Sequence, residues 1–162
     1  MRVGHSSGIV KRALLLTTVV ALIAATAATA ALTPTQYRAK LNAMCRGFTP
    51  KMKTQERAMT AAQKANNPQA YGQALGKLLV YTLQEDANIE STPVPAAMRT
   101  QMTPIITTLK KADTHIRAAI QAAINNNAQG LTTQLKAAGT VAKGLNAKLD
   151  AAGLRDCGSR QT

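Results

Sequence analysis

The sequence predicts an all-α protein, an up-and-down helical bundle of four to five helices with one disulfide. Three observations lead to this prediction. Alanine is the commonest residue and helix formers are frequent. The 162 residues include no Trp, three Tyr and one Phe, so aromatic strand formers are scarce. Thr-Pro and Asn-Pro pairs recur, and a capping side chain followed by proline is a typical helix start.

Residues 1–30 are typical of an export signal peptide. Basic residues are followed by an apolar stretch, residues 13–23, and by the small-residue sequence Ala28-Thr29-Ala30. We therefore expect a signal peptide over 1–30 and one helical-bundle domain over 31–162. The alternative is an uncleaved membrane anchor, because residues 13–32 are uncharged and nominally long enough to span a bilayer. Removing the three basic residues of the leader from a total of 20 leaves 17 basic and 7 acidic residues, a net charge of +10.

The first two expected helices cover residues 34–46 and 50–65. In the first, an apolar stripe at helical spacing ends before Gly47, which predicts a stop there. Pro50 predicts the start of the second, which is weaker because methionines and alanines supply its apolar content.

The remaining helices are expected over residues 68–88, 95–124 and 128–152. The middle of the first of these is apolar nearly all round, which indicates a central, buried helix. Pro104 predicts a kink or a restart inside the next one. The sequence 125–127, three asparagines, predicts the turn before the last helix. That helix has the most regular apolar seam: Leu131, Leu135, Ala138, Ala142, Leu145, Leu149 and Ala152.

Cys45 and Cys157 are the two cysteines of the chain, and both lie beyond the leader. An even count in an exported chain predicts one disulfide, whereas two unrelated buried thiols are the alternative. Their spacing excludes a C-x-x-C redox motif and a zinc finger.

Catalysis is hard to find in this sequence. His115 is the one histidine beyond the leader, and Asp113 lies two positions away, where it cannot pair with it on a helix. Serines are few, and no phosphate loop, haem motif or calcium-binding spacing is present. We therefore expect a non-enzymatic protein with no catalytic residue, no metal ligands and no cofactor.

Two binding hypotheses remain, and each has candidate residues. Basic residues form stripes along two helices and could bind an anionic wall polymer or membrane surface: Arg99, Lys110, Arg117, Lys136 and Lys143. Nucleic acid is a poor fit because aromatic residues and recognition motifs are lacking. The alternative is a carrier with a pocket for a small apolar ligand inside the bundle, with Asp86 at the pocket mouth and flexible methionines such as Met98 and Met102 in its wall. A solvated cationic face and ordinary core methionines are the plain readings of the same residues.

Three segments give the chain a resemblance to a known group. They are residues 37–46 (YRAKLNAMCR), Pro93-Val94-Pro95 and the ending 153–158 (GLRDCG). They resemble small exported helical proteins of high-GC Gram-positive bacteria, which carry an A-x-A-x-C first helix and a closing G-L-x-x-C. The resemblance implies a bridge between the two cysteines but no activity. Unlike lipoprotein members of the group, this chain has no lipobox. We expect a secreted or cell-envelope protein that binds anionic envelope material, with ligand carriage as the alternative.

Overall fold

The computed structural model of this chain describes residues 31–159, which are helical apart from short connections and the tail. Its elements are α1 (Pro34–Lys64), α2 (Pro68–Ser91), a 3-10 turn η1 (Ala96–Met98), α3 (Arg99–Ile124), α4 (Ala128–Val141) and α5 (Leu145–Ala151). The predicted all-α bundle is confirmed. The predicted signal peptide, residues 1–30, lies outside the described residues. No helix within 31–159 is both long enough and apolar enough to cross a membrane.

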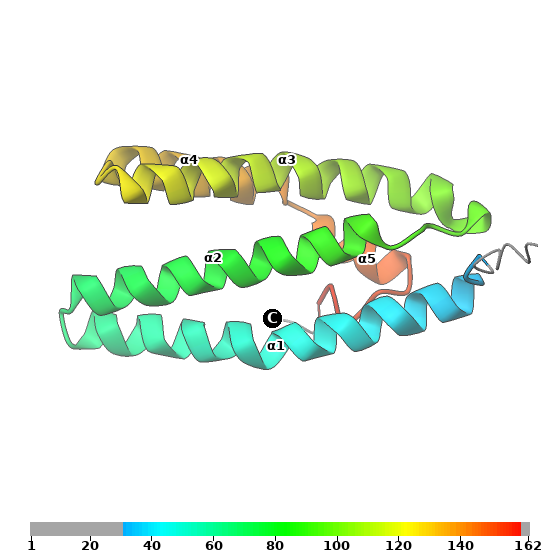
Figure 1. The fold of residues 1–162 in the computed structure, drawn as a ribbon, viewed down its shortest axis with the longest axis horizontal. Helices are drawn as coiled ribbons and strands as arrows, with labels where there is room; N and C mark the ends of the chain where they lie inside the picture. Colours follow the sequence, from blue (N-terminus) through cyan, green and yellow to red (C-terminus); the bar gives the residue numbers. More distant parts are fainter. Residues whose placement is uncertain (1–30, 160–162) are drawn as a thin grey trace, which may run out of the picture. The chain divides into compact units, whose positions relative to one another are not determined.

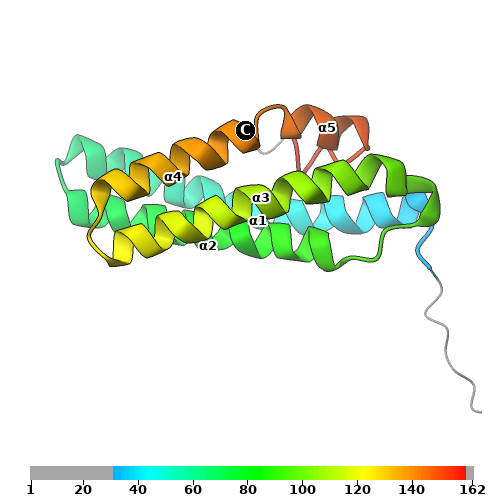
Figure 2. The same ribbon diagram turned by 90° about the horizontal axis from the view of Figure 1, so that it is seen from above.

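The long helices pair as two antiparallel hairpins, α1 with α2 and α3 with α4 (Figure 1). The two hairpins meet chiefly through α2 and α3. Both hairpin turns lie at one end of the bundle. The connection from α2 to α3 lies at the opposite end, and α5 lies at that end too (Figure 2). We call these the turn end and the closed end.

The two hairpin turns share one backbone geometry. Asn66 and Asn126 adopt the left-handed conformation, with φ of 49° and 54°, which asparagine tolerates better than most residues. The next residue caps the following helix: Asn67 and Asn127 each accept a hydrogen bond from the backbone N–H three positions later, at 3.0 and 2.8 Å. The predicted turn at 125–127 is confirmed.

The predicted break in the first helix is wrong, because α1 runs through Gly47 and Pro50 without interruption. Pro50 cannot donate a hydrogen bond to the carbonyl of Arg46, which removes one helical bond. Next to it, the Thr49 hydroxyl donates to the carbonyl of Cys45 at 3.0 Å. Since α1 packs along the length of α2, tertiary contacts outweigh the local stop signals.

The predicted last helix is also wrong in its continuity, because it ends at Val141 and restarts as α5 at Leu145. Gly144 between them has a φ of +76°, which no continuous right-handed helix contains. The inward face is nevertheless kept across the break, since the seam residues on both sides are buried: Ala138, Leu145, Leu149 and Ala152.

Two smaller differences concern α2 and α3. The prediction that α2 is buried all round is wrong on one side, since Val80 is 44% exposed while Leu79 is buried. At Pro104, α3 neither stops nor restarts; it begins at Arg99, after η1, and continues through the proline.

The closed end holds the larger part of the core and the C-terminal tail. Arg38 and Asn42 of α1 donate to the backbone carbonyls of residues 152–153, both at 2.9 Å. The Asn42 side chain also accepts from the backbone N–H of Asp156 at 3.0 Å, and Arg46 forms an ion pair with the Asp156 carboxylate. We call these three side chains of α1 the tail clasp.

Cys45 and Cys157 form a disulfide beside the tail clasp, with 5.1 Å between their Cα atoms. The predicted bridge is confirmed, and it joins α1 to the tail across 112 residues of sequence. The tail is held more firmly than its composition suggests, because Leu154 is fully buried in the core. A disulfide of this kind is typical of an oxidising, extracytoplasmic environment.

Candidate ligand-binding cleft

A cleft of about 310 Å³ lies between the two hairpins. Its walls come from all five helices and from Cys157 of the tail. Small-molecule sites typically have volumes of about 300–1,000 Å³, so this cleft suits a small ligand. Most of its lining is apolar: Met52, Leu79, Ile89, Leu109, Ala112, Ile116, Leu135, Ala138, Ala142, Leu145 and Leu149.

An acidic pair marks the polar part of the cleft. Asp86 of α2 lines the cleft and is 7% exposed. Its carboxyl group is hydrogen-bonded to that of Asp113 on α3, which is also 7% exposed. The second oxygen of Asp113, Oδ1, is buried and has no hydrogen-bond partner. We call Asp86 and Asp113 the acidic pair.

The acidic pair holds a proton at neutral pH. Burial, together with the hydrogen bond to Asp113 and the neighbouring negative charges, raises the pKa of Asp86 from 3.8 to about 9. Burial also raises the pKa of Asp113. Two carboxylates in contact in a desolvated site cannot both ionise easily, so the pair shares a proton through their hydrogen bond.

Charged residues around the pair come from α2 and α3. Glu85 and Glu90 add negative charge from α2. Burial and the negative charge of Asp113 raise the pKa of Glu90. The positive charges of Lys110 and Arg117, which are exposed on α3, lower the same pKa. Arg117 also favours ionisation of Asp113. Within residues 31–159, no basic side chain forms an ion pair with either member of the acidic pair.

The three predicted pocket residues are placed differently from one another. Asp86 faces the cleft, as one of the two sequence interpretations expected. Met98 and Met102 instead lie in the core at the closed end, 1% and 0% exposed, and do not line the cleft. Of the other methionines, Met52 lines the cleft.

Asp113, which is hydrogen-bonded to the cleft residue Asp86, is the member of the acidic pair that sequence reasoning missed. The nearby His115 has another partner, since its Nδ1 donates to Gln134 Oε1 of α4 at 2.8 Å. A signal for Asp113 is present in the sequence, since it interrupts an apolar stripe between Leu109 and Ile116. Asp86 interrupts the stripe of α2 in the same manner.

The predicted basic stripes lie on the outside of the bundle. All five of their side chains are exposed: Arg99, Lys110, Arg117, Lys136 and Lys143. Two of them stand near carboxylates, as described above, which partly offsets their charge. A further basic surface lies on α1, where a hollow is lined by Arg46, Lys53 and Arg57 together with Asp156.

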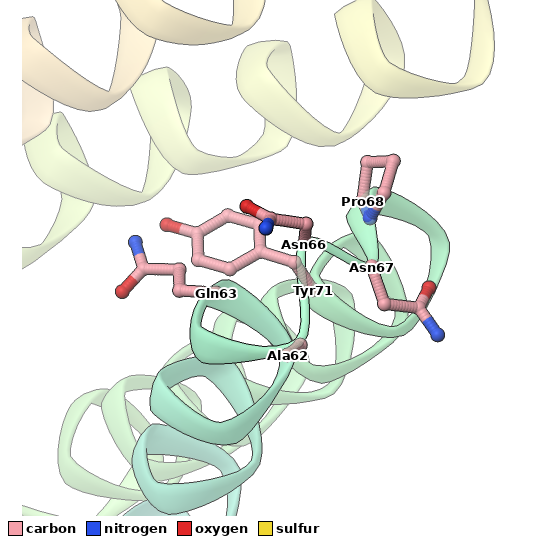
Figure 3. Close-up of a pocket in the computed structure, with 6 residues that line it drawn as sticks. All are labelled: Ala62, Gln63, Asn66, Asn67, Pro68 and Tyr71. Carbon is pink, nitrogen blue, oxygen red and sulfur yellow. The ribbon is translucent and has the colours of Figure 1, made fainter.

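A second hollow, of about 380 Å³, lies on the surface of the turn end. Figure 3 shows the Tyr71 ring beside the side chains of Gln63 and Asn66, while Asn67 points away from them. The asparagines that line this hollow are explained by the hairpin turn. Asn126 and Asn127 adopt the same conformation in the other hairpin, where no tyrosine corresponds to Tyr71. The hollow also has no charged lining, so we regard the cleft as the stronger candidate.

One side-chain group in residues 31–159 has the spacing of a metal site. The sulfurs of Cys45 and Cys157 and a carboxylate oxygen of Glu85 lie within 4.8 Å of one another. Both sulfurs, however, are joined in the disulfide, and a metal ligand must be a free thiolate. This donor set therefore does not suit a metal ion in the oxidised protein.

Comparison of the chain with protein-family models, curated proteins and solved structures finds no match. The fold and the cleft describe the class of protein: a disulfide-linked helical bundle with an apolar cleft between two hairpins, and with Asp86 of a buried acidic pair in the cleft wall.

Proposed function

We propose that this protein is an exported, non-enzymatic carrier that holds a small, mainly apolar molecule in the cleft between its hairpins. The observation that carries the proposal is the cleft of about 310 Å³ with its apolar lining. Apolar surface left in contact with water is unfavourable, and a ligand that covers it gains roughly 25 cal/mol per Å². The signal peptide expected for residues 1–30 and the disulfide support placement outside the cytoplasm.

Gly139 offers a direct test of this proposal. It lies on α4 in the wall of the cleft, and a Cβ atom added there would meet no other atom within 4 Å. Gly139 is exposed at the edge of the cleft, so Gly139→Leu should obstruct the cleft without disturbing the helix. The matched control is Gly72→Leu on α2, which is also exposed, has the same open space around it and lies outside the cleft, beside a separate hollow.

The measurement is native mass spectrometry of the exported protein, together with organic extraction and identification of what it releases. We expect the wild type and Gly72→Leu to carry a small molecule and Gly139→Leu to lack it. Equal retention by Gly139→Leu would show that the cleft is not the binding site.

A second candidate function is binding to phosphate-bearing envelope surfaces through the cationic faces. The observation that favours it is the α1 hollow, where Lys53 and Arg57 lie beside the Arg46–Asp156 ion pair, alongside the exposed basic residues of α3 and α4. Such binding should weaken steeply as salt rises, because exposed charges are screened over about 8–10 Å at physiological ionic strength.

Charge reversal tests this second candidate. The triple variant Arg99→Glu, Lys110→Glu and Arg117→Glu should release the protein from vesicles that contain phosphatidylglycerol, as measured by co-sedimentation. Neutral vesicles serve as the control. Undiminished binding by the triple variant would remove the α3 stripe from this function.

A further inference from the structure

We propose that the ligand of the cleft is a small amphiphile with a protonated amine, whose ammonium group binds the acidic pair while its hydrocarbon part fills the apolar lining. This inference rests on the proposed carrier function and names its ligand class. It follows from the distribution of charge in the molecule and from the position of Asp86, which lines the cleft and is bonded to Asp113 behind it.

Negative charge is concentrated inside this protein, whereas positive charge lies on its surface. The chain carries 20 basic and 7 acidic residues, yet four of the seven acids lie on the facing helices α2 and α3: Glu85, Asp86, Glu90 and Asp113. Glu85, Asp86 and Asp113 are buried, whereas the basic residues nearest to them are exposed. A protein with a strongly positive exterior therefore keeps a negative site inside.

The acidic pair has hydrogen-bonding capacity that the protein leaves unused. Asp113 Oδ1 is buried without a partner, and leaving a buried acceptor unsatisfied is costly. Asp86, which is bonded to Asp113, lines the cleft directly. An ammonium group placed beside Asp86 would donate a hydrogen bond to its carboxyl group and bring a positive charge into the cleft, whose lining contains no basic side chain.

The remaining walls of the cleft suit the hydrocarbon part of such a ligand. Of the other elements that line the cleft, α1 contributes Met52, and α4 and α5 contribute aliphatic side chains, Gly139 and the neutral Asn146. A metal ion would leave the apolar lining of the cleft uncovered, because it interacts with converging oxygens and not with hydrocarbon. One cationic head on an apolar body matches both parts of the cleft.

Binding of the ammonium group has a defined proton balance. In the empty cleft, the pair holds a proton between its two carboxyl groups, as its raised pKa indicates. When the ammonium group binds, that proton leaves to the solvent and both carboxylates become ionised. The amine keeps its own proton, so binding should release up to about one proton for each amine bound.

The experiment compares three probes of equal chain length: n-octylamine, n-octanol and n-octanoate. Their binding to the full exported protein is measured by isothermal titration calorimetry in buffers of different ionisation enthalpy, which gives the number of protons released. The variants are Asp86→Asn, which removes the charge with little change in shape, and Gly139→Leu, which obstructs the cleft. Glu56→Gln on the exposed side of α1 is the matched control.

We expect n-octylamine to bind about tenfold or more tightly than n-octanol, as a charge-assisted hydrogen bond provides, and n-octanoate to bind most weakly. Asp86→Asn should abolish the preference for the amine and the proton release while n-octanol still binds. Glu56→Gln should behave as the wild type.

Other outcomes separate the two proposals. Equal binding of n-octylamine and n-octanol, lost in Gly139→Leu, would overturn the amine class and leave the carrier function standing. Amine binding that survives in both Asp86→Asn and Gly139→Leu would place it on the surface and overturn the inference. Absence of binding by all three probes would contradict the carrier function itself.

Discussion

At the scale of single residues, the acidic pair makes the stability of the folded protein depend on pH. Burial raises the pKa of Asp86 from 3.8 to about 9, so the folded protein holds a proton that the unfolded chain releases. The unfolded state therefore binds fewer protons between about pH 4 and about pH 9, and stability falls as the pH rises through that window. The limit is about 1.4 kcal/mol for each pH unit and each proton.

Asp86→Asn should remove this pH dependence. We expect the free energy of unfolding of the wild type to fall between about pH 5 and about pH 8, and that of Asp86→Asn to fall less. At the higher pH, the variant should be the more stable protein. Urea unfolding followed by circular dichroism measures both quantities. Glu56→Gln should keep the wild-type slope; the same slope in Asp86→Asn would show that another group is responsible.

Tyr37 presents a second buried polar atom. Its side chain is fully buried in the core at the closed end, its hydroxyl has no hydrogen-bond partner within residues 31–159, and burial raises its pKa. Tyr37→Phe should therefore leave stability unchanged or increase it by about 1 kcal/mol, because an unsatisfied hydroxyl no longer has to be desolvated. Thermal unfolding measures this. A loss of more than about 1 kcal/mol would reveal a partner such as a bound water.

At the scale of secondary structure, Pro50 interrupts the hydrogen bonds of α1 without ending the helix. Pro50→Ala restores the donor for the Arg46 carbonyl, so we expect a more stable protein by about 1–3 kcal/mol, the range set by proline and alanine propensities. Pro34→Ala is the control, since Pro34 occupies the first turn, where its missing N–H costs nothing. If Pro50→Ala is destabilised, the local shape of α1 at the proline is needed for packing.

The helices show which part of the fold the sequence predicts. Starts at Pro34 and Pro68 and the turn at Asn126 follow from capping chemistry, which is local and readable in the sequence. Continuity through Gly47 and Pro50 depends on packing against α2, which sequence patterns do not contain. The break at Gly144 cannot be seen in the sequence pattern, because the apolar seam continues across it.

The cleft shows the same division. Asp86 stood out as an acid on an apolar helix face, but its partner Asp113 lies 27 positions away on another helix. Their contact depends on the register between α2 and α3, and no periodicity within one helix reports it. Met98 and Met102 are flexible apolar side chains, and such residues suit a cavity wall and a solid core equally well.

At the scale of the whole molecule, the C-terminal tail is held by both covalent and polar contacts. The bridge closes a loop of 112 residues, for which the chain-entropy model gives about 4–5 kcal/mol. Replacing Cys45 and Cys157 by serine should lower the free energy of unfolding by about 2–4 kcal/mol, because bridges seldom give the full entropic value. Urea unfolding of the double variant, with the oxidised wild type as reference, measures this difference in the free energy of unfolding.

The tail clasp makes a separate prediction about the same variant. With the bridge removed, Asn42 still holds both Gly153 and Asp156, so the tail should stay docked. Adding Asn42→Ala should then release it, seen as faster hydrogen exchange at residues 153–158. The control is Asn88→Ala on the exposed side of α2, which should leave the hydrogen exchange of residues 153–158 unchanged when it is added to the cysteine variant. Fast exchange in the cysteine variant alone would mean that the polar contacts contribute little.

The bridge, the tail clasp and the α2–α3 connection all lie toward the closed end. We therefore expect the two hairpins to tilt relative to each other about that end, which acts as a pivot. A helix of 24 residues such as α2 is about 36 Å long. A tilt of about five degrees about the pivot moves its far tip by about 3 Å, which follows from that length. Small motions at the closed end are therefore magnified at the turn end. We therefore expect the separation between the hairpins to vary most at the turn end, where the two asparagine turns lie.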